Sequence, residues 1–235
     1  MSDSQVLLQT AFILKHRKYR ESSVILDVLT RDYGIISILA RGVRKPKSKT
    51  AGVLLAFTDL KISYIDKYEL KVLTHVELGE SSIKLEKISL YCGFYVNELL
   101  SYFLHKNDPH PEVYEVYKQC LVSLSQTQNT EQILRFFELD LIEYIGYGFD
   151  LSINAKQDQP VDALKKYCYD PEVGLVDSVT GYISGTTLRS LALRKNLNTQ
   201  DLYEAKQLMR RIIDFQLQGK VLKSRAVLAK IIKQL

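Results

Sequence analysis

The sequence predicts an α+β fold in which an N-terminal five-stranded OB-fold β-barrel is followed by a helical domain with an irregular insertion. Two observations lead to this expectation. Residues 1–80 contain short β-branched and aliphatic runs separated by turn residues. After residue 80, apolar residues recur at helical spacing instead. We therefore expect an OB-fold domain over residues 1–80 and a mainly helical domain over residues 81–235.

The barrel is expected because five strands with short turns fit into about 75 residues. A polar turn follows the second strand, and its Gly34 is free to adopt a positive φ. An OB-fold is the commonest five-stranded barrel, and an SH3-like barrel fits the pattern almost as well. The expected strands are Val6–Lys15, Ser23–Leu29, Ile35–Ala40, Phe57–Ile65 and Glu69–Leu78.

The first helix of the helical domain is indicated by Ile88, Tyr91 and Tyr95, which recur at helical spacing. The Pro-containing segment 108–111 ends this helix. We expect Thr130 to cap a later helix that ends at the glycines of residues 146–148. Further helices are expected over residues 113–124, 185–194 and 200–217 and from about residue 224. Residues 152–184 read as irregular, with short β-like pieces at Tyr167–Tyr169 and Leu175–Val176.

Membrane and secretory classes are disfavoured by composition. No apolar run approaches the ~20 residues that span a bilayer. The apolar stretch Val6–Leu14 is interrupted by polar residues and precedes its cations, unlike a signal peptide. We therefore expect a cytoplasmic location.

The three cysteines lie far apart and form no CxxC pair; they are Cys92, Cys120 and Cys168. We therefore expect reduced thiols and no four-cysteine zinc site.

Charge is unevenly distributed along the chain. The net charge of +5 divides into +4 over residues 1–80, −7 over residues 81–188 and +8 over residues 189–235. Two basic ends therefore flank an acidic middle, which points to polyanion binding. The alternative is that the basic ends aid solubility or dock on the acidic middle.

The densest basic segment is the loop expected between the third and fourth strands. Gly42 and Pro46 keep it irregular, so its cations can follow a phosphate backbone rather than read base edges. Replacing Arg44, Lys45 and Lys47 by alanine should then weaken binding to all sequences alike. A solvated charge run is the alternative. The predicted DNA contacts are Arg41, Arg44, Lys45, Lys47 and Lys49.

Two further basic segments are candidates. The end of the first strand places an aromatic residue among cations, which could stack on a base, although an exposed turn is an equal alternative. Its candidate residues are Lys15, Arg17, Lys18, Tyr19 and Arg20, with His16 among them. The C-terminal helices present further cations opposite an apolar stripe, where a solvated face is the alternative. Their candidates are Lys206, Arg210, Lys223 and Arg225, followed or flanked by Lys220, Lys230 and Lys233.

Catalytic constellations are weak. His105, Asp108 and His110 lie in a Pro-containing loop rather than at metal-ligand spacing on a helix. The acidic residues of segment 138–143 do not share one helix face. Neither a phosphate-binding loop nor a nucleophile motif is present. We therefore expect no enzyme activity, no catalytic residue, no cofactor and no bound metal.

Several collinear segments resemble the RecO family of bacterial recombination mediators. No single motif is specific, but the order of the motifs along nearly the whole chain is. The matching segments are Ala11–Leu14, Tyr19–Ser23, Leu26–Thr30, Ala40–Arg44, Phe57–Leu60, Tyr95–Leu100, Asp108–Glu112, Arg135–Leu139, Gly146–Asp150 and Lys223–Arg225.

The resemblance implies an OB-fold, a helical domain and a bacterial cytoplasmic protein associated with the nucleoid. It also implies binding to single- and double-stranded DNA, annealing of complementary strands, and work with RecR and the single-strand-binding protein SSB in loading RecA. Many family members hold zinc through four cysteines near residues 152–184, where this chain has only Cys168. It resembles the zinc-less branch, in which packing of Tyr167, Tyr169, Leu175 and Val176 could replace the metal.

If the resemblance extends to partners, the acidic and hydrophobic tail of SSB needs a docking site. We expect this site at Arg135, Leu139 and Ile142, which form an apolar strip beside one positive charge. The rival interpretation is that Arg135 pairs with Glu131 or Glu138 on its own helix. At the level of the whole protein, a protein–protein adaptor without direct DNA binding is the alternative to a DNA-binding mediator.

Overall fold

The structure is a computed structural model that describes residues 4–232. The chain divides into two compact units. We call Met1–Gln128 with Ser224–Leu235 the barrel unit, and Asn129–Lys223 the helical unit. The change from strands to helices falls inside the barrel unit, between residues 78 and 87.

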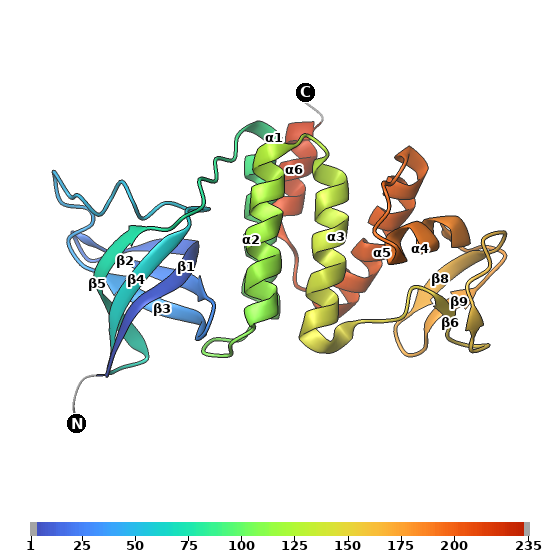
Figure 1. Ribbon diagram of the computed structural model, residues 1–235, viewed down its shortest axis with the longest axis horizontal. Helices are drawn as coiled ribbons and strands as arrows, with labels where there is room; N and C mark the ends of the chain where they lie inside the picture. The colour runs from blue at the N-terminus through green and yellow to red at the C-terminus, as the bar shows by residue number, and fades with distance from the viewer. Residues whose placement is uncertain (1–3, 233–235) are drawn as a thin grey trace. The chain divides into compact units, whose positions relative to one another are not determined.

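The barrel unit begins with five strands that pair in the order β1-β2-β3-β5-β4, and β4 pairs back to β1, so the sheet closes (Figure 1). All pairs are antiparallel except β3 with β5, which are parallel over Ser37–Leu39 and Leu70–Val72. The predicted OB-fold class is thereby confirmed. The strands are β1 (Ser4–Tyr19), β2 (Ser23–Thr30), β3 (Gly34–Ala40), β4 (Leu60–Asp66) and β5 (Leu70–Leu78).

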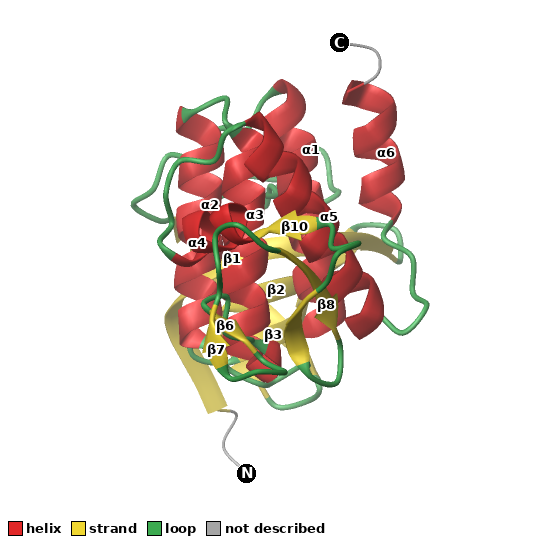
Figure 2. Cartoon of the chain, turned by 90° about the vertical axis from the view of Figure 1, so that its right-hand side faces the viewer, coloured by secondary structure: helices red, strands yellow, loops and turns green. Residues whose placement is uncertain are grey.

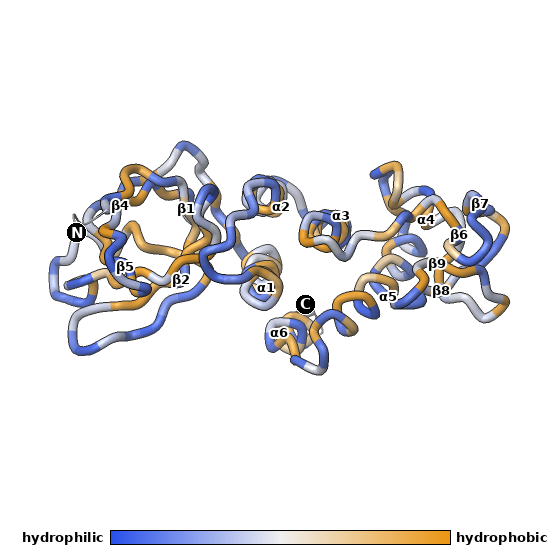
Figure 3. The backbone as a smooth tube through the Cα atoms, turned by 90° about the horizontal axis from the view of Figure 1, so that it is seen from below, coloured by the Kyte–Doolittle hydropathy of each residue, from blue (hydrophilic) through white to orange (hydrophobic). Residues whose placement is uncertain are grey.

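The barrel interior is filled by the alternating apolar residues of its strands. Ile13, Leu26, Ile38, Ile62 and Tyr64 are each at most 2% exposed and belong to one packed cluster. In Figure 3 the strands carry most of the hydrophobic colour of this unit, and the connections between them are mostly hydrophilic. Burial of these side chains, each contributing about 1.5–3 kcal/mol, is the main stabilisation of the barrel.

Two strand boundaries differ from the prediction. β4 starts at Leu60 and not at Phe57, because Phe57 has a positive φ of 64° and its ring packs 5.0 Å from the ring of Phe94. β1 continues past Lys15 to Tyr19, which pairs with Ser23 of β2. The ladder with β2 extends the strand although its side chains there are cationic and exposed, since the backbone hydrogen bonds do not depend on side-chain polarity.

Two helices of the barrel unit, α1 (Lys87–Phe103) and α2 (Pro111–Gln126), pack on the outer face of β1. Most of α6 (Lys223–Ile232) also belongs to this unit, and its Ser224 N–H donates to the Glu98 carboxylate of α1 at 2.8 Å. Phe12 of β1 lies 5.2 Å from the ring of Tyr117 on α2. The loop between α1 and α2 lies on β3, where the Asn107 N–H donates to the Ile35 carbonyl at 3.0 Å. A Cβ on Gly34, whose φ is +66°, would lie 2.1 Å from the Asp108 carbonyl oxygen, so this contact needs glycine.

The helical unit contains α3 (Thr130–Ile142), α4 (Gly185–Ala192) and α5 (Thr199–Gln216), with a π-helical turn, η1 (Glu143–Tyr147), after α3. The predicted cap at Thr130 is wrong, since Thr130 is the first helical residue and Asn129 precedes it at the cap position. The predicted apolar stripe of α5 is buried, as Ala205, Met209, Ile212 and Ile213 are at most 1% exposed.

The segment expected to be irregular contains five short strands: β6 (Ile153–Asn154), β7 (Gln159–Pro160), β8 (Lys166–Asp170), β9 (Gly174–Asp177) and β10 (Ile183–Ser184). The two predicted β-like pieces lie in β8 and β9, which pair antiparallel. Three of these strands form a sheet in the order β10-β8-β9 (Figure 2). In this sheet, β10 contacts both α4 and α5, and β8 contacts α5. Tyr167 and Leu175 are buried in this sheet, whereas Tyr169 and Val176 are half-buried.

Candidate nucleic-acid interface

One end of the barrel brings together the two basic segments of the N-terminal sequence. The strand pairs Tyr19–Ser23 and Val24–Ala40 place the β1–β2 turn, residues 20–22, beside the start of the β3–β4 connection, residues 41–59. We call this turn, this connection and the exposed part of β1 from residue 15 to residue 19 the basic end. Sequence analysis identified both segments but not their adjacency, because about 20 residues separate them along the chain.

The basic loop is fixed to the barrel at several points. The backbone N–H of Arg44 donates to the Ser22 carbonyl at 2.9 Å, and its guanidinium donates to the Arg20 carbonyl at 3.1 Å. Val43, together with Val53 and Leu54 further along the connection, packs against the barrel core. Arg44 therefore positions the loop in addition to contributing charge, and it is exposed like its neighbours Lys45 and Lys47.

The other cations of the basic end carry uncompensated charge. Within residues 4–232, none of these side chains forms an ion pair. All of them are exposed. Unpaired cations on one surface attract a polyanion by releasing its counterions. They are Lys15, Arg17, Lys18, Arg20, Arg41, Lys45, Lys47 and Lys49.

A hollow of about 720 Å³ lies between the turn and the loop. The Tyr19 side chain is half-buried at its edge, and the Arg20 guanidinium lies 5.3 Å from the centre of the Tyr19 ring. Apart from Leu39 and Gly42 the lining is otherwise polar or charged, with one acid among its cations. It comprises Tyr19, Arg20, Glu21, Ser22, Ser23, Leu39, Arg41, Gly42 and Lys45. Such a lining suits a nucleotide, with cations for the phosphate and an aromatic ring for the base.

The C-terminal cations are divided between the two units. Lys206 and Lys223 belong to the helical unit, whereas Arg225 belongs to the barrel unit. Lys206 pairs with Glu131 at 2.8 Å, and the Arg225 guanidinium lies 5.9 Å from the Tyr95 ring centre. Arg210 is exposed on α5 and forms no ion pair with another residue of the described range. Lys220 and Lys230 are also exposed, and Lys233 lies outside the described residues.

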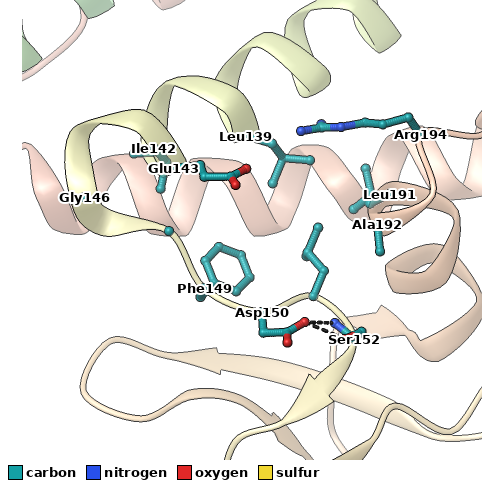
Figure 4. A pocket seen from close by; sticks show the side chains of 12 residues that line it. Leu139, Ile142, Glu143, Gly146, Phe149, Asp150, Ser152, Leu191, Ala192 and Arg194 are labelled. Atoms are coloured by element: carbon teal, nitrogen blue, oxygen red, sulfur yellow. Dashed lines mark hydrogen bonds between the residues drawn. The ribbon is translucent and has the colours of Figure 1, made fainter. Parts of the chain in front are cut away.

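A second hollow, of about 780 Å³, lies within the helical unit. Leu139 and Ile142 line it, as do Phe149 and Leu191, and Figure 4 shows the Leu139, Phe149 and Leu191 side chains facing the same space. The cation at its rim is Arg194, which pairs with Asp140. Arg194 could not be found from local sequence patterns because it lies about 55 residues from Leu139, and only the fold places it beside α3.

Arg135 is placed differently from the other two residues of its predicted site. It is 6% exposed, and its guanidinium lies 2.6 Å from the Glu138 carboxylate, which is 1% exposed. This arrangement matches the rival interpretation, in which Arg135 pairs with an acid of its own helix. A guanidinium held inside the unit in this way does not present its charge to a ligand at the surface.

The described residues do not fit a zinc site. Between residues 4 and 232, no group of three or more histidine, cysteine or acidic side chains could hold a metal ion. Cys168 is half-buried, while Cys92 and Cys120 are buried elsewhere as free thiols.

No described helix is both long and apolar enough to cross a membrane.

The closed barrel places the chain in the class of OB-fold proteins, many of which bind oligonucleotides. Two family profiles match it, "Recombination protein O N terminal" over residues 1–82 and "Recombination protein O C terminal" over residues 87–226. The chain belongs to the RecO family of DNA repair proteins.

Relatives of the same family are similar over almost their full length. A DNA repair protein RecO from Methylococcus capsulatus is 38% identical over 224 residues, which cover 94% of this chain and 93% of the relative. The corresponding protein from Nitrosococcus oceani is 36% identical over 232 residues, covering 97% of this chain and 94% of the relative. The corresponding protein from Photobacterium profundum is 37% identical over 221 residues, which cover 93% of this chain and 94% of the relative.

Proposed function

We propose that this protein binds single- and double-stranded DNA through the basic end of the barrel, anneals complementary strands and, with RecR and SSB, promotes RecA loading. The observation that carries the proposal is the set of exposed, unpaired cations on the β1–β2 turn and the β3–β4 connection. Membership of the RecO family supports it. The cations of the helical unit, including Arg210, are a second DNA contact in this proposal.

The loop end is a better candidate than the outer face of the strands. OB-folds commonly bind ligands on the face of strands 2 and 3. Here Leu29 of β2 is 1% exposed and Ile35 of β3 is 5% exposed, with the α1–α2 loop bonded to Ile35. A strand of DNA could not reach these residues without displacing the loop, so the barrel offers its loop end instead.

The proposed annealing does not depend on ATP. No phosphate-binding loop motif is present in the sequence, so the chain has no recognised means of coupling nucleotide hydrolysis to work. The protein acts in this proposal by neutralising phosphate repulsion between two strands and not by catalysis.

The test is DNA binding and annealing as a function of salt. Changing Lys45, Lys47 and Lys49 to alanine should weaken binding to all sequences alike. It should also make the log–log salt slope shallower by about 0.7 for each phosphate of a single strand that is no longer neutralised. A second triple variant, with Arg44, Lys45 and Lys47 changed to alanine, should bind more weakly still if Arg44 also positions the loop.

A matched control changes Lys67, Lys84 and Lys87 to alanine, which removes the same charge from exposed positions of the barrel unit that lie outside the basic end. It should retain the parent's salt slope. Bare strands and SSB-coated strands should both be annealed without ATP by the wild-type protein. Absence of DNA binding by the wild type would leave the protein–protein adaptor as the function.

For SSB we propose that its acidic, hydrophobic tail docks in the hollow of the helical unit at Leu139 and Ile142. The support is the group of apolar side chains in its lining, Leu139, Ile142, Phe149 and Leu191, together with the Arg194 guanidinium. Such a group suits a carboxylate next to an aromatic side chain, and the acids Glu143 and Asp150 also line the hollow. Arg194→Ala should weaken binding of the tail peptide but not of bare DNA. Arg135→Ala should instead destabilise the fold, because it leaves Glu138 as a buried charge without this partner.

A further inference from the structure

We propose that Glu21 gives the basic end a preference for guanine at one position of a bound single strand. This inference rests on the proposed function, because it concerns the same DNA site. It adds base recognition to a surface whose lysines and arginines would otherwise bind only the backbone.

Glu21 is an acid placed among cations. It lines the hollow together with Arg20, Arg41 and Lys45. It is exposed, and its carboxylate forms no hydrogen bond or ion pair with any residue between 4 and 232. A negative charge here weakens attraction to phosphate, so backbone binding gives no reason for it. Nor does the local fold, since the carboxylate caps no helix and bonds no turn.

The neighbouring side chains could hold a base beside this carboxylate. The Arg20 guanidinium lies 5.3 Å from the centre of the Tyr19 ring, and both groups are of the kind on which unpaired bases stack. Arg41 and Lys45 line the same hollow and can contact the flanking phosphates. A base stacked at Tyr19 or Arg20 would then present its edge to Glu21, which lines the same hollow.

An ionised carboxylate only accepts hydrogen bonds, so it distinguishes bases by the donors on their Watson–Crick edge. Guanine presents two adjacent donors, N1–H and the N2 amino group, which can engage both carboxylate oxygens. Adenine and cytosine each present one amino group beside a ring nitrogen that only accepts. Thymine presents one N–H between two carbonyl oxygens that repel the carboxylate. The expected order is therefore guanine first and thymine last.

This edge is available only on a single strand, because base pairing occupies it in a duplex. The preference should therefore vanish for double-stranded DNA of the same composition. The loop lysines would set the overall affinity and its salt dependence, while Glu21 would set the difference between bases.

The experiment measures fluorescence anisotropy of the full chain with short thymine oligonucleotides that carry one central guanine, inosine or no substitution. Wild-type protein should prefer the guanine strand by about five-fold or more, as expected for a two-bond contact to a base. Inosine lacks the N2 amino group, so the affinity for the inosine strand should lie between those for the guanine strand and the all-thymine strand. Glu21→Gln should remove most of the preference and bind the all-thymine strand more tightly, since one negative charge is removed.

Glu69→Gln is the matched control, because Glu69 is an exposed acid in the β4–β5 connection of the same barrel and lies outside the hollow. It should keep the guanine preference, and thermal unfolding should verify that both variants fold. If wild-type protein binds all strands equally, or if Glu21→Gln retains the preference, the inference is wrong while the proposed function stands. If wild-type protein binds none of them, the proposed function itself fails.

Discussion

Asn97 is a single residue that joins three elements of the barrel unit. Its amide on α1 donates to the Leu14 carbonyl of β1 at 3.1 Å, and its side-chain oxygen accepts from the Tyr117 hydroxyl of α2 at 2.6 Å. β1 has a register shift between Ile13 and Lys15, which leaves a carbonyl free to accept this bond. Burial raises the pKa of Tyr117 well above its ordinary value, so the hydroxyl stays protonated as the donor.

Removing either partner alone should destabilise the protein. Asn97→Leu leaves the buried Tyr117 hydroxyl and the Leu14 carbonyl without their partner, and Tyr117→Phe leaves the Asn97 oxygen without its donor. Each change should lower the free energy of unfolding in urea by about 1–3 kcal/mol. The double variant should lose less than the sum of the two single variants. Strictly additive losses would show that the Asn97–Tyr117 bond contributes nothing.

At the scale of elements, α4 and α5 are tied together through a carboxylate. Glu204 of α5 accepts from the Ser184 N–H at the start of α4 at 2.8 Å, and also from the hydroxyls of Ser184 and Thr187 and the amide of Gln200. Burial acts to raise the pKa of Glu204, but these hydrogen bonds outweigh it and hold the pKa below the ordinary 4.5. The first turn of α4 is thus completed by its neighbour.

This arrangement predicts a loss of stability in acid. A carboxyl group with a lowered pKa in the folded state stabilises the fold above its unfolded pKa, and this contribution is lost as pH falls through the folded pKa. Wild-type protein should therefore exceed Glu204→Gln in unfolding free energy near pH 7, and the difference should shrink below about pH 4. Urea unfolding of both proteins across this pH range measures the difference in unfolding free energy. A difference that does not change with pH would contradict the stabilising role of the Glu204 carboxylate.

At the scale of the whole molecule, the segment over residues 152–184 is built without a metal-ligand set. Cys168 is the only cysteine between residues 152 and 184. Tyr167 is 1% exposed and Leu175 0% exposed, and the Tyr167 hydroxyl accepts from the Asp162 N–H at 2.8 Å. Packing and backbone hydrogen bonds therefore hold β8 and β9 together.

We accordingly expect purified, untagged protein to contain well below one zinc per chain. Metal analysis by mass spectrometry measures this directly, and unfolding with and without a chelator measures any dependence of the fold on metal. Stoichiometric zinc that is lost together with the fold would overturn the prediction.

The sequence by itself determined the barrel strands, the helices and the fold class, but not the short strands β6, β7 and β10. The β-branched and aliphatic runs of the five barrel strands and the helical spacing at α2, α3 and α5 depend on near neighbours, so local patterns suffice to predict them. The same holds for Gly34, whose turn position predicted its positive φ, and for the cations at residues 41–49. The predicted strand boundaries were wrong where a contact with a distant residue decided them. Phe57, for example, packs on Phe94 and does not belong to β4.

Only the tertiary structure decided which residues share a site. Closure of the barrel sets the β1–β2 turn beside the β3–β4 connection and so places Glu21 among cations from another segment. Folding of the helical unit buries Arg135 against Glu138 and puts Arg194 beside Leu139 instead. The physical reason is that pairing and packing join residues far apart in the chain, whereas spacing along a sequence records only the face of a single helix or strand.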